Sequence, residues 1–335
     1  MSTPALFARR KFLQPGGLKL LRVAAQFRNL KARNKQDGLG RTLNYVCKRL
    51  DIDPVHGRRV ATGLKTLAHP GEWVGRRRIS DLVGHTGGIR IQHGIDHLAL
   101  PVGVLQGANT LVERLAGQFE RKREEVERNY EPPFSILLET EATPHGPRLL
   151  KTEDWKSVVD FAALPQIVGI VAEYLQQIPV LSVVSFVYTM PGTGLIGSQL
   201  FHCDMNHARQ LHLVVPIEEI DDQSGPFSFF PGDTTEKVLR QLNYRQGRLS
   251  DADVFRVVDP EKLLRANGPP GSAFFINPAR CLHFGARAST KTRLMLILNY
   301  TCYNEGAEGL SGVYRAINRD VFDTGDPIRK ALLRL

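Results

Sequence analysis

The chain has 335 residues, with 44 Lys and Arg against 34 Asp and Glu, and therefore carries a formal net charge of +10. Apolar residues make up 42% of it and charged residues 23%, a balance that is typical of folded globular proteins and excludes a wholly disordered chain. No apolar run reaches the length of about 18 residues that a transmembrane helix needs. The four cysteines form no CxxC pair, which argues against a disulfide framework and against a structural zinc site.

The positive charge is concentrated at the N-terminus. Residues 1–50 contain twelve Lys and Arg and one acid, a net charge of +11, so the remaining 285 residues sum to about −1. A nucleic-acid-binding body would carry its basic residues on the folded surface, and nucleic acid is therefore disfavoured as a partner. The sequence predicts a near-neutral body with a basic arm.

Within this arm, Leu20, Val23 and Phe27 share one face of a helical period and basic residues share the opposite face. Two interpretations stay open: the helix docks on an anionic membrane surface, or it packs on the body with a solvated basic face, which is the commoner arrangement. The start ARRKFLQPGG looks like a twin-arginine signal, but no apolar segment follows it. We expect a cytoplasmic protein, peripheral to a membrane if the arm docks, with a mitochondrial location as the alternative.

Helical patterns dominate the next part of the chain. We expect residues 51–150 to form a mixed, partly helical region with a charged helix at about 108–128 that ends before Pro132 and Pro133. A second helical segment follows at about 153–177, interrupted near Pro165.

After Pro179 the pattern becomes extended. The run at 180–189, VLSVVSFVYT, is β-branched and aromatic, and shorter strand-like runs follow between Gly, Pro, Asn and Asp turn signals. Many short strands predict a mainly β domain with flanking helices, built as a sandwich or jelly-roll barrel rather than a βαβ sheet. We place this domain at 151–315, with a helical insert at about 234–267, and expect 316–335 to be a C-terminal tail.

Two strand-like runs carry the chemistry. In FHCDMN, His202 and Asp204 are two residues apart, so in an extended strand both side chains point to one face. One imidazole and one carboxylate are two ligands of the 2-His-1-carboxylate arrangement that holds non-haem Fe(II). The third ligand must come from another strand, and His283 in CLHFGAR is the candidate. Ten residues later Arg293 opens TRLMLILNY, where its guanidinium could bind a carboxylate in a bidentate manner.

A structural interpretation of the same residues is the alternative. An HxD triplet alone is weak evidence, and these histidines could be satisfied barrel residues while Arg293 forms an ordinary ion pair. A buried arginine on an apolar strand needs an anionic partner, however, which favours the functional interpretation.

The segments SQLFHCD (198–204) and DDQSGPFSFFPGD (221–233), with His283 and Arg293, resemble the phytanoyl-CoA dioxygenase family of Fe(II)- and 2-oxoglutarate-dependent oxygenases. The resemblance covers about residues 160–300. It implies a double-stranded β-helix core, which is a cupin-like jelly roll, and agrees with the strand pattern.

Residue by residue, the resemblance implies that His202, Asp204 and His283 bind Fe(II) and that Arg293 holds the C5 carboxylate of 2-oxoglutarate. It also suggests that Gln199 helps to position this cosubstrate. Halogenating relatives replace the carboxylate ligand with a small residue, so the presence of Asp204 argues for hydroxylation. Met205 and Asn206 leave the metal strand and are candidates for the substrate wall.

The resulting hypothesis is a dioxygenase that uses Fe(II), 2-oxoglutarate and O2 to hydroxylate a small organic substrate, whether lipid-linked, a sugar or a secondary metabolite. Decarboxylation of 2-oxoglutarate to succinate accompanies the reaction. One alternative is a non-catalytic cupin-like protein that binds a metabolite. A second is an oxygenase directed to nucleic acid by the basic N-terminus.

For several other histidines and for Cys281, the sequence favours structural roles. His207 and His212 are expected to lie behind the ligands or in the core. His93 and His97 are spaced like a helical metal pair, but their Gly-rich surroundings do not predict a helix. Cys281 shares strand parity with His283 and is expected to be a small buried residue close to the iron.

Overall fold

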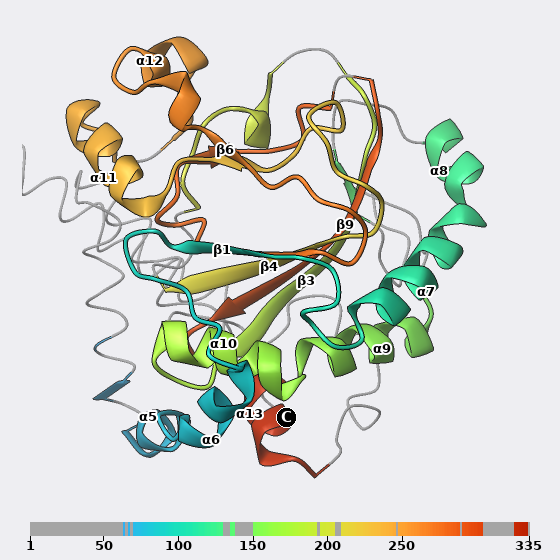
Figure 1. Ribbon diagram of the computed structural model, residues 1–335, viewed down its shortest axis with the longest axis vertical. Helices are drawn as coiled ribbons and strands as arrows, with labels where there is room; N and C mark the ends of the chain where they lie inside the picture. Colours follow the sequence, from blue (N-terminus) through green and yellow to red (C-terminus); the bar gives the residue numbers. More distant parts are fainter. Residues whose placement is uncertain are drawn as a thin grey trace, which may run out of the picture.

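The computed structural model describes a defined part of the chain, namely residues 63, 66–67, 70–129, 135–137, 150–192, 195–204, 209–245, 247–288, 290–303 and 325–333. The basic arm at 1–50 lies outside these residues, so its expected helix and docking surface stay predictions. Figure 1 shows sheets at the centre with helices below and to the sides.

The larger sheet is antiparallel and has six strands in the order β1-β7-β4-β9-β3-β2. The strands are β1 (His97–Leu100), β2 (Ser135–Leu137), β3 (Val180–Thr189), β4 (Gln210–Pro216), β7 (Ala273–Ile276) and β9 (Arg293–Thr301). The predicted run at 180–189 is β3, and its register with β9 extends from Val180 opposite Thr301 to Thr189 opposite Arg293. Its β-branched and aromatic residues suit this central position.

The smaller sheet has the order β6-β5-β8 and is also antiparallel. Its strands are β5 (Ser228–Phe229), β6 (Leu264–Arg265) and β8 (His283–Phe284). Phe229 of this sheet shares an apolar cluster with Val187, Val214 and Met295 of the larger sheet, so the two sheets pack face to face. We call the side of the larger sheet that faces the smaller one its inner face. The structure thus consists of antiparallel sheets with flanking helices, which confirms the expectation of strands flanked by helices rather than a βαβ sheet.

Helices cover the opposite, outer face of the larger sheet (Figure 1). They are α5 (Pro70–Arg76), α6 (Ser80–Val83), η2 (Gly84–Thr86), α7 (Ala108–Glu120), α8 (Arg123–Asn129), α9 (Thr152–Ala162), α10 (Pro165–Leu175) and α13 (Pro327–Leu333). Pro165 begins α10 and separates it from α9, as the sequence predicts. A Cβ on Gly169 would lie 2.3 Å from the Leu82 carbonyl oxygen, so the contact between α10 and α6 requires glycine.

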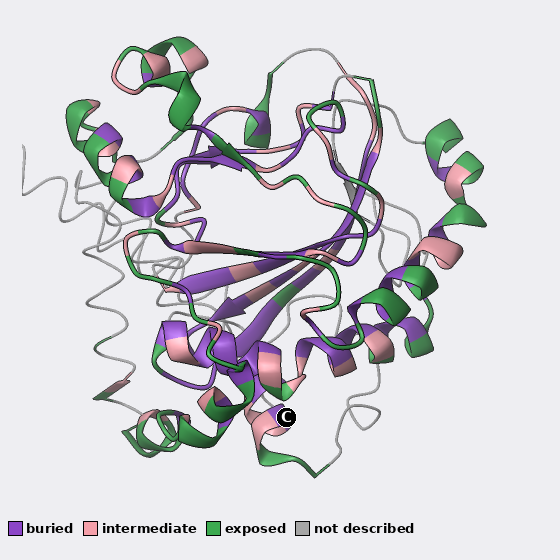
Figure 2. Cartoon of the chain, in the orientation of Figure 1, coloured by how far each residue is buried: buried purple, intermediate pink, exposed green. Residues whose placement is uncertain are grey.

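The burial pattern in Figure 2 follows this layering, with buried residues along the sheet and on the helix sides that face it. Leu294, Leu296 and Leu298 of β9 pack in one core cluster with Ile170 of α10. No described helix is long and apolar enough by itself to cross a membrane; α9 and α10 pass that test only as a pair, bent by 55°.

The helical insert contains α11 (Gly232–Gln241), α12 (Asp251–Phe255) and the 3-10 turn η4 (Pro260–Lys262), and β6 follows it. Val238 and Val254 of the insert pack with Phe201, Leu282 and Phe284. The insert therefore buttresses the two segments that carry His202 and His283.

Residues 51–150 and the predicted tail at 316–335 both contribute elements to the body that contains the predicted β domain. Residues 51–150 provide β1 and β2, the two edge strands of the larger sheet, so residue 151 does not separate two bodies. Edge strands of three or four residues are too short to give a clear periodicity. The predicted tail contains α13, whose Leu332 and Leu333 are buried in the main core.

Candidate metal centre

Three side chains that the sequence singles out come together between the sheets. His202 and His283 face each other across an antiparallel bridge, with backbone N···O distances of 2.8 and 2.9 Å in the two directions. This pairing sets their rings side by side, with centroids 4.3 Å apart. Asp204 follows two residues later on the same segment. One ligand atom from each of the three residues lies within 4.8 Å of the others, so the group can hold a metal ion.

Backbone carbonyls orient both imidazoles. Nδ1 of His202 lies 2.8 Å from the Leu200 oxygen, and Nδ1 of His283 lies 2.8 Å from the Cys281 oxygen. Because a carbonyl oxygen only accepts, each Nδ1 donates its proton and each Nε2 keeps a free lone pair. The Nε2 atoms lie 3.4 and 3.9 Å from Oδ1 of Asp204. Metal-binding histidines are commonly oriented in the same way, by an acceptor such as a backbone carbonyl that holds the proton of the other ring nitrogen.

The charge states also suit a metal site. Burial lowers the pKa of His283 to about 3, so its imidazole is neutral at physiological pH. Burial acts to raise the pKa of Asp204, but its interactions with His202, His283 and His212 outweigh burial and hold that pKa well below its ordinary value. His283 therefore offers a neutral imidazole and Asp204 an ionised carboxylate, the protonation states in which these groups coordinate metals.

Arg293 opens β9 on the inner face and is 2% exposed. Its Nη1 donates to the Gly225 oxygen at 2.6 Å, and its Nη2 donates to Oγ1 of Thr189 at 3.1 Å. Within the described ranges, no carboxylate pairs with this guanidinium and its buried Nε has no hydrogen-bond partner. Burial lowers the pKa of Arg293 to about 10. A buried cation in this state favours an anionic ligand.

The other predicted site residues are Gln199, Met205 and Asn206, and the structure describes only the first of them. Gln199 ends the short turn η3 (Gly197–Gln199), where its Oε1 accepts from the Ile196 backbone N–H at 3.1 Å and its Nε2 donates to the Ala286 oxygen at 2.7 Å. The amide thus closes a loop, and its contact with a cosubstrate stays a prediction. Met205 and Asn206 lie outside the described residues.

Phe227 is a site residue that the sequence argument does not single out. Its ring stacks on His283 with centroids 4.6 Å apart and an interplanar angle of 23°. It lies in the stretch 221–233 that carries the family resemblance, and the sequence holds no other indication of its role. Stacking between residues 56 positions apart depends on tertiary structure. Thr189, the partner of Arg293, was missed for the same reason.

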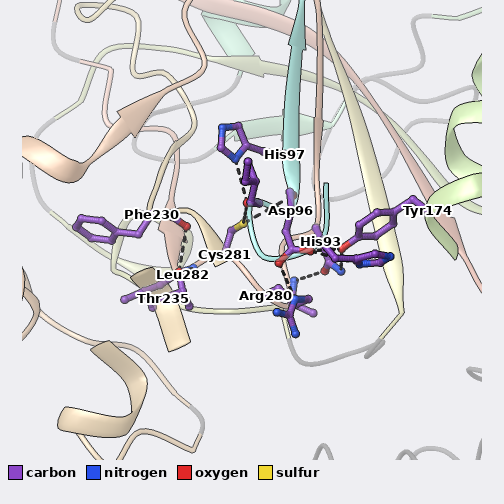
Figure 3. A network of polar contacts seen from close by, with 12 residues as sticks. His93, Asp96, His97, Tyr174, Phe230, Thr235, Arg280, Cys281 and Leu282 are labelled. Atoms are coloured by element: carbon purple, nitrogen blue, oxygen red, sulfur yellow. Dashed lines mark hydrogen bonds and ion pairs between the residues drawn. The ribbon is translucent and has the colours of Figure 1, made fainter. Parts of the chain in front are cut away.

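Of the other histidines for which the sequence favours structural roles, His207 lies outside the described residues. His212 on β4 is close enough to the centre to affect the pKa of both Asp204 and His283. His93 stacks on Tyr174, whereas His97 lies in β1 with its ring edge on Phe229, so they do not form a metal pair (Figure 3). Cys281 is buried, and its burial raises the pKa of the thiol.

No protein-family model and no curated protein matches the sequence. The chain is similar to HygX from Streptomyces hygroscopicus with nickel and 2-oxoglutarate bound, at 15% identity and a TM-score of 0.44, over 64% of this chain and 88% of HygX. It is similar to EctD from S. alaskensis with 2-oxoglutarate and 5-hydroxyectoine, at 16% identity and a TM-score of 0.48, over 75% of this chain and 89% of EctD. A third similar structure is the non-heme alpha ketoglutarate dependent carbocyclase SnoK from nogalamycin biosynthesis, at 15% identity and a TM-score of 0.43, over 71% of this chain and 90% of SnoK.

Proposed function

We propose that the protein is an Fe(II)- and 2-oxoglutarate-dependent oxygenase that hydroxylates a small organic molecule. The observation that carries this proposal is the combination of a His-Asp-His group with a buried arginine that has no acidic partner among the described residues. Both lie in the space between the two sheets. A metal site alone would fit many classes of protein. A buried arginine that needs an anionic ligand beside this site favours enzymes that bind a carboxylate cosubstrate.

The donor set fits Fe(II). Two imidazoles and one carboxylate on one side of an octahedral ion are the 2-His-1-carboxylate arrangement of non-haem Fe(II) oxygenases, which leaves positions for other ligands. His202, Asp204 and His283 would hold the metal. When bound, Fe(II) with 2-oxoglutarate and O2 would supply the oxidising chemistry, in which 2-oxoglutarate loses CO2 and becomes succinate.

The chain's own residues would bind and orient the reactants. The guanidinium of Arg293, steadied by Thr189 and the Gly225 carbonyl, presents a positive charge to a distal carboxylate of the cosubstrate. A charge-assisted hydrogen bond in such a dry site contributes about 1.5–3 kcal/mol. The Leu200 and Cys281 carbonyls hold the protons of the two imidazoles on Nδ1, which keeps each Nε2 directed to the centre.

Apolar side chains would exclude water from this space. Phe227 covers one face of the His283 ring, and Phe229, Phe274 and Met295 fill the volume between the sheets. A low local dielectric strengthens the attraction between Arg293 and a carboxylate. No protein general base is required for removal of a hydrogen from carbon, so the chain needs no further acid or base for this reaction.

An anaerobic titration tests the proposal. Purified protein with Fe(II) and 2-oxoglutarate should show a weak charge-transfer absorption at about 500 nm, typical of this chelate. The band should be lost in His202→Ala and should require 2-oxoglutarate. A missing band, or one that persists in His202→Ala, would reject the assignment.

Turnover separates an enzyme from a cupin-like binding protein, the main alternative. Succinate release should rise when the correct metabolite is added to a screen of candidate small molecules. A protein that binds Fe(II) and 2-oxoglutarate but releases no succinate with any candidate would favour the non-catalytic alternative. We also propose that the chain belongs to the phytanoyl-CoA dioxygenase family and that its two sheets form a double-stranded β-helix.

We also propose a cytoplasmic location with membrane contact through residues 1–50. Their net charge of +11 would bind anionic lipid. Removal of residues 1–40 should abolish sedimentation with phosphatidylserine vesicles. Salt-sensitive binding of RNA or DNA by the intact chain, lost in the same truncation, would instead favour a nucleic-acid-directed oxygenase.

A further inference from the structure

The turn at 277–281, between β7 and β8, supports two of the three candidate ligands. The backbone N–H of Asp204 donates to the Pro278 oxygen at 2.9 Å. The Cys281 oxygen accepts from Nδ1 of His283 at 2.8 Å and so sets the orientation of that ring. A shift of this turn would move both a carboxylate and an imidazole of the centre.

The turn is closed by Asn277. The Asn277 oxygen accepts from the backbone N–H groups of Arg280 and Cys281 at 3.1 and 3.0 Å, and its side-chain oxygen accepts from the N–H of Ala279 at 3.0 Å. These bonds shape the turn but do not fix it to the rest of the protein.

Asp96, just before β1, fixes the turn to the body of the protein (Figure 3). Its side chain is fully buried, and its Oδ2 accepts from Nε of Arg280 at 2.6 Å. Its Oδ1 accepts from the Tyr174 hydroxyl at 2.6 Å, and that hydroxyl accepts from Nδ2 of Asn277 at 2.9 Å. Its own carbonyl accepts from the backbone N–H of Asn277 at 2.9 Å. One residue therefore holds both ends of the turn and connects them to α10.

The position of Asp96 is itself closely constrained. Its backbone has φ +62°, an uncommon value for a residue other than glycine. Gly232, at the start of α11, packs so closely that a Cβ there would lie 2.1 Å from Oδ2 of Asp96. The carboxylate thus has little freedom to move, and a partner bonded to it is held in one place.

From these contacts we infer that Asp96, with Arg280 and Tyr174, is a positioning group for the metal centre, acting through the turn at 277–281. The inference rests on the proposed metal site, because it concerns the geometry of Asp204 and His283. None of the three residues is placed among the metal ligands. Their effect would be transmitted by the backbone of the turn.

A purely structural ion pair elsewhere in the chain provides a matched control. Arg114 on α7 donates to Asp154 on α9 at 2.8 Å, compared with 2.6 Å between Arg280 and Asp96. In both pairs the aspartate is fully buried and the arginine side chain is about half exposed, at 41% and 45%. Only the Asp96 pair is connected to the turn at 277–281.

The test compares Arg280→Gln and Tyr174→Phe with the control Arg114→Gln. Each variant is titrated with Co(II), whose visible absorption reports its coordination geometry, and the unfolding midpoint of the metal-free protein is measured in parallel. We expect Arg280→Gln and Tyr174→Phe to weaken Co(II) binding by about tenfold, as substitution of residues that support metal ligands commonly does, and to alter the spectrum of the bound ion. Arg114→Gln should lower the unfolding midpoint but leave both the affinity and the spectrum as in the unchanged protein.

Three other results would overturn the inference. Wild-type affinity and spectrum in both Arg280→Gln and Tyr174→Phe would show that the turn does not depend on this network. Equal weakening in Arg114→Gln would show that metal binding follows general stability. A wild-type protein that binds no Co(II) would remove the metal site, and with it the proposed function, whereas in the first two cases the proposed function stands.

Discussion

Arg293 and Leu294 are neighbours on β9, yet they lie in opposite environments. Leu294 belongs to the apolar core under the helices and is fully buried there. Arg293 points to the inner face, where its guanidinium contacts the Gly225 oxygen and Thr189 but no described carboxylate. The alternation of a β-strand thus separates a side chain that stabilises the fold from one whose burial is costly.

The same contrast holds for the two faces of the larger sheet. On the outer face the buried Tyr300 hydroxyl is satisfied within the protein, because it donates to the Ala162 oxygen at 2.9 Å. On the inner face Arg293 is buried without a described carboxylate, and His202, Asp204 and His283 gather on the segments that lie opposite this face. We infer from this difference that the outer face of the larger sheet mainly stabilises the fold, whereas its inner face borders the proposed binding site.

The largest effect is expected at the candidate metal ligands, which lie opposite the inner face of the larger sheet. His202→Ala removes one ligand atom and should weaken Fe(II) binding by more than about 100-fold, since substitution of residues that merely support ligands already costs up to that factor. Anaerobic calorimetric titration measures this loss. The circular dichroism spectrum should stay unchanged, and tight binding by the variant would contradict the division between the faces.

Leu294→Ala tests the outer face. Deletion of a fully buried leucine side chain should lower the free energy of unfolding by about 2–5 kcal/mol, because it leaves a cavity in the core. Urea denaturation measures this change. The folded fraction should still bind Fe(II) normally, and a selective loss of metal affinity at unchanged stability would be the opposite of what we expect.

Arg293→Met sharpens the contrast with its neighbour. The variant loses the charged hydrogen bonds to the cosubstrate and should bind 2-oxoglutarate at least about tenfold more weakly. Its metal-free stability should be equal to or higher than that of the wild type, because a desolvated cation is removed. Equilibrium dialysis and thermal unfolding provide the two measurements, and a strongly destabilised variant with normal 2-oxoglutarate affinity would refute this role.

The smallest effect concerns pH. His283 has a pKa of about 3 in the folded protein against an ordinary value of 6.5, so between these values the unfolded chain binds a proton that the folded one does not. Stability of the metal-free protein should therefore fall as the pH decreases from 6.5, by at most about 1.4 kcal/mol per pH unit from this residue. His283→Gln should reduce that slope in denaturation curves recorded between pH 7 and 5, and an identical slope would exclude His283 as its source.

Much of the fold could be predicted because its elements carry local patterns. The run at 180–189 identified β3, and Pro165 marked the break between α9 and α10. The edge strands β1 and β2 escaped prediction because their three or four residues form no recognisable period. The core position of α13 also depends on contacts with distant segments.

In the candidate site, too, some features could be predicted from the sequence and others could not. The spacing of His202 and Asp204 placed both on one side of an extended segment, and the apolar strand around Arg293 indicated a buried cation. Stacking of Phe227 on His283 could not be inferred, because it requires segments from two strands to meet. The link from Asp96 to Arg280 spans 184 positions and has no local signal at either end.

The sequence by itself determined which residues can coordinate a metal and bind an anion, because side-chain chemistry and strand parity are local properties. Only the tertiary structure decided that His283 lies beside His202, that Arg293 has no described acidic partner, and that Asp96 holds the turn next to the candidate ligands. These features depend on which strands pair and in which register. Register is set by the packing of the whole core, so no single segment of the chain could reveal it.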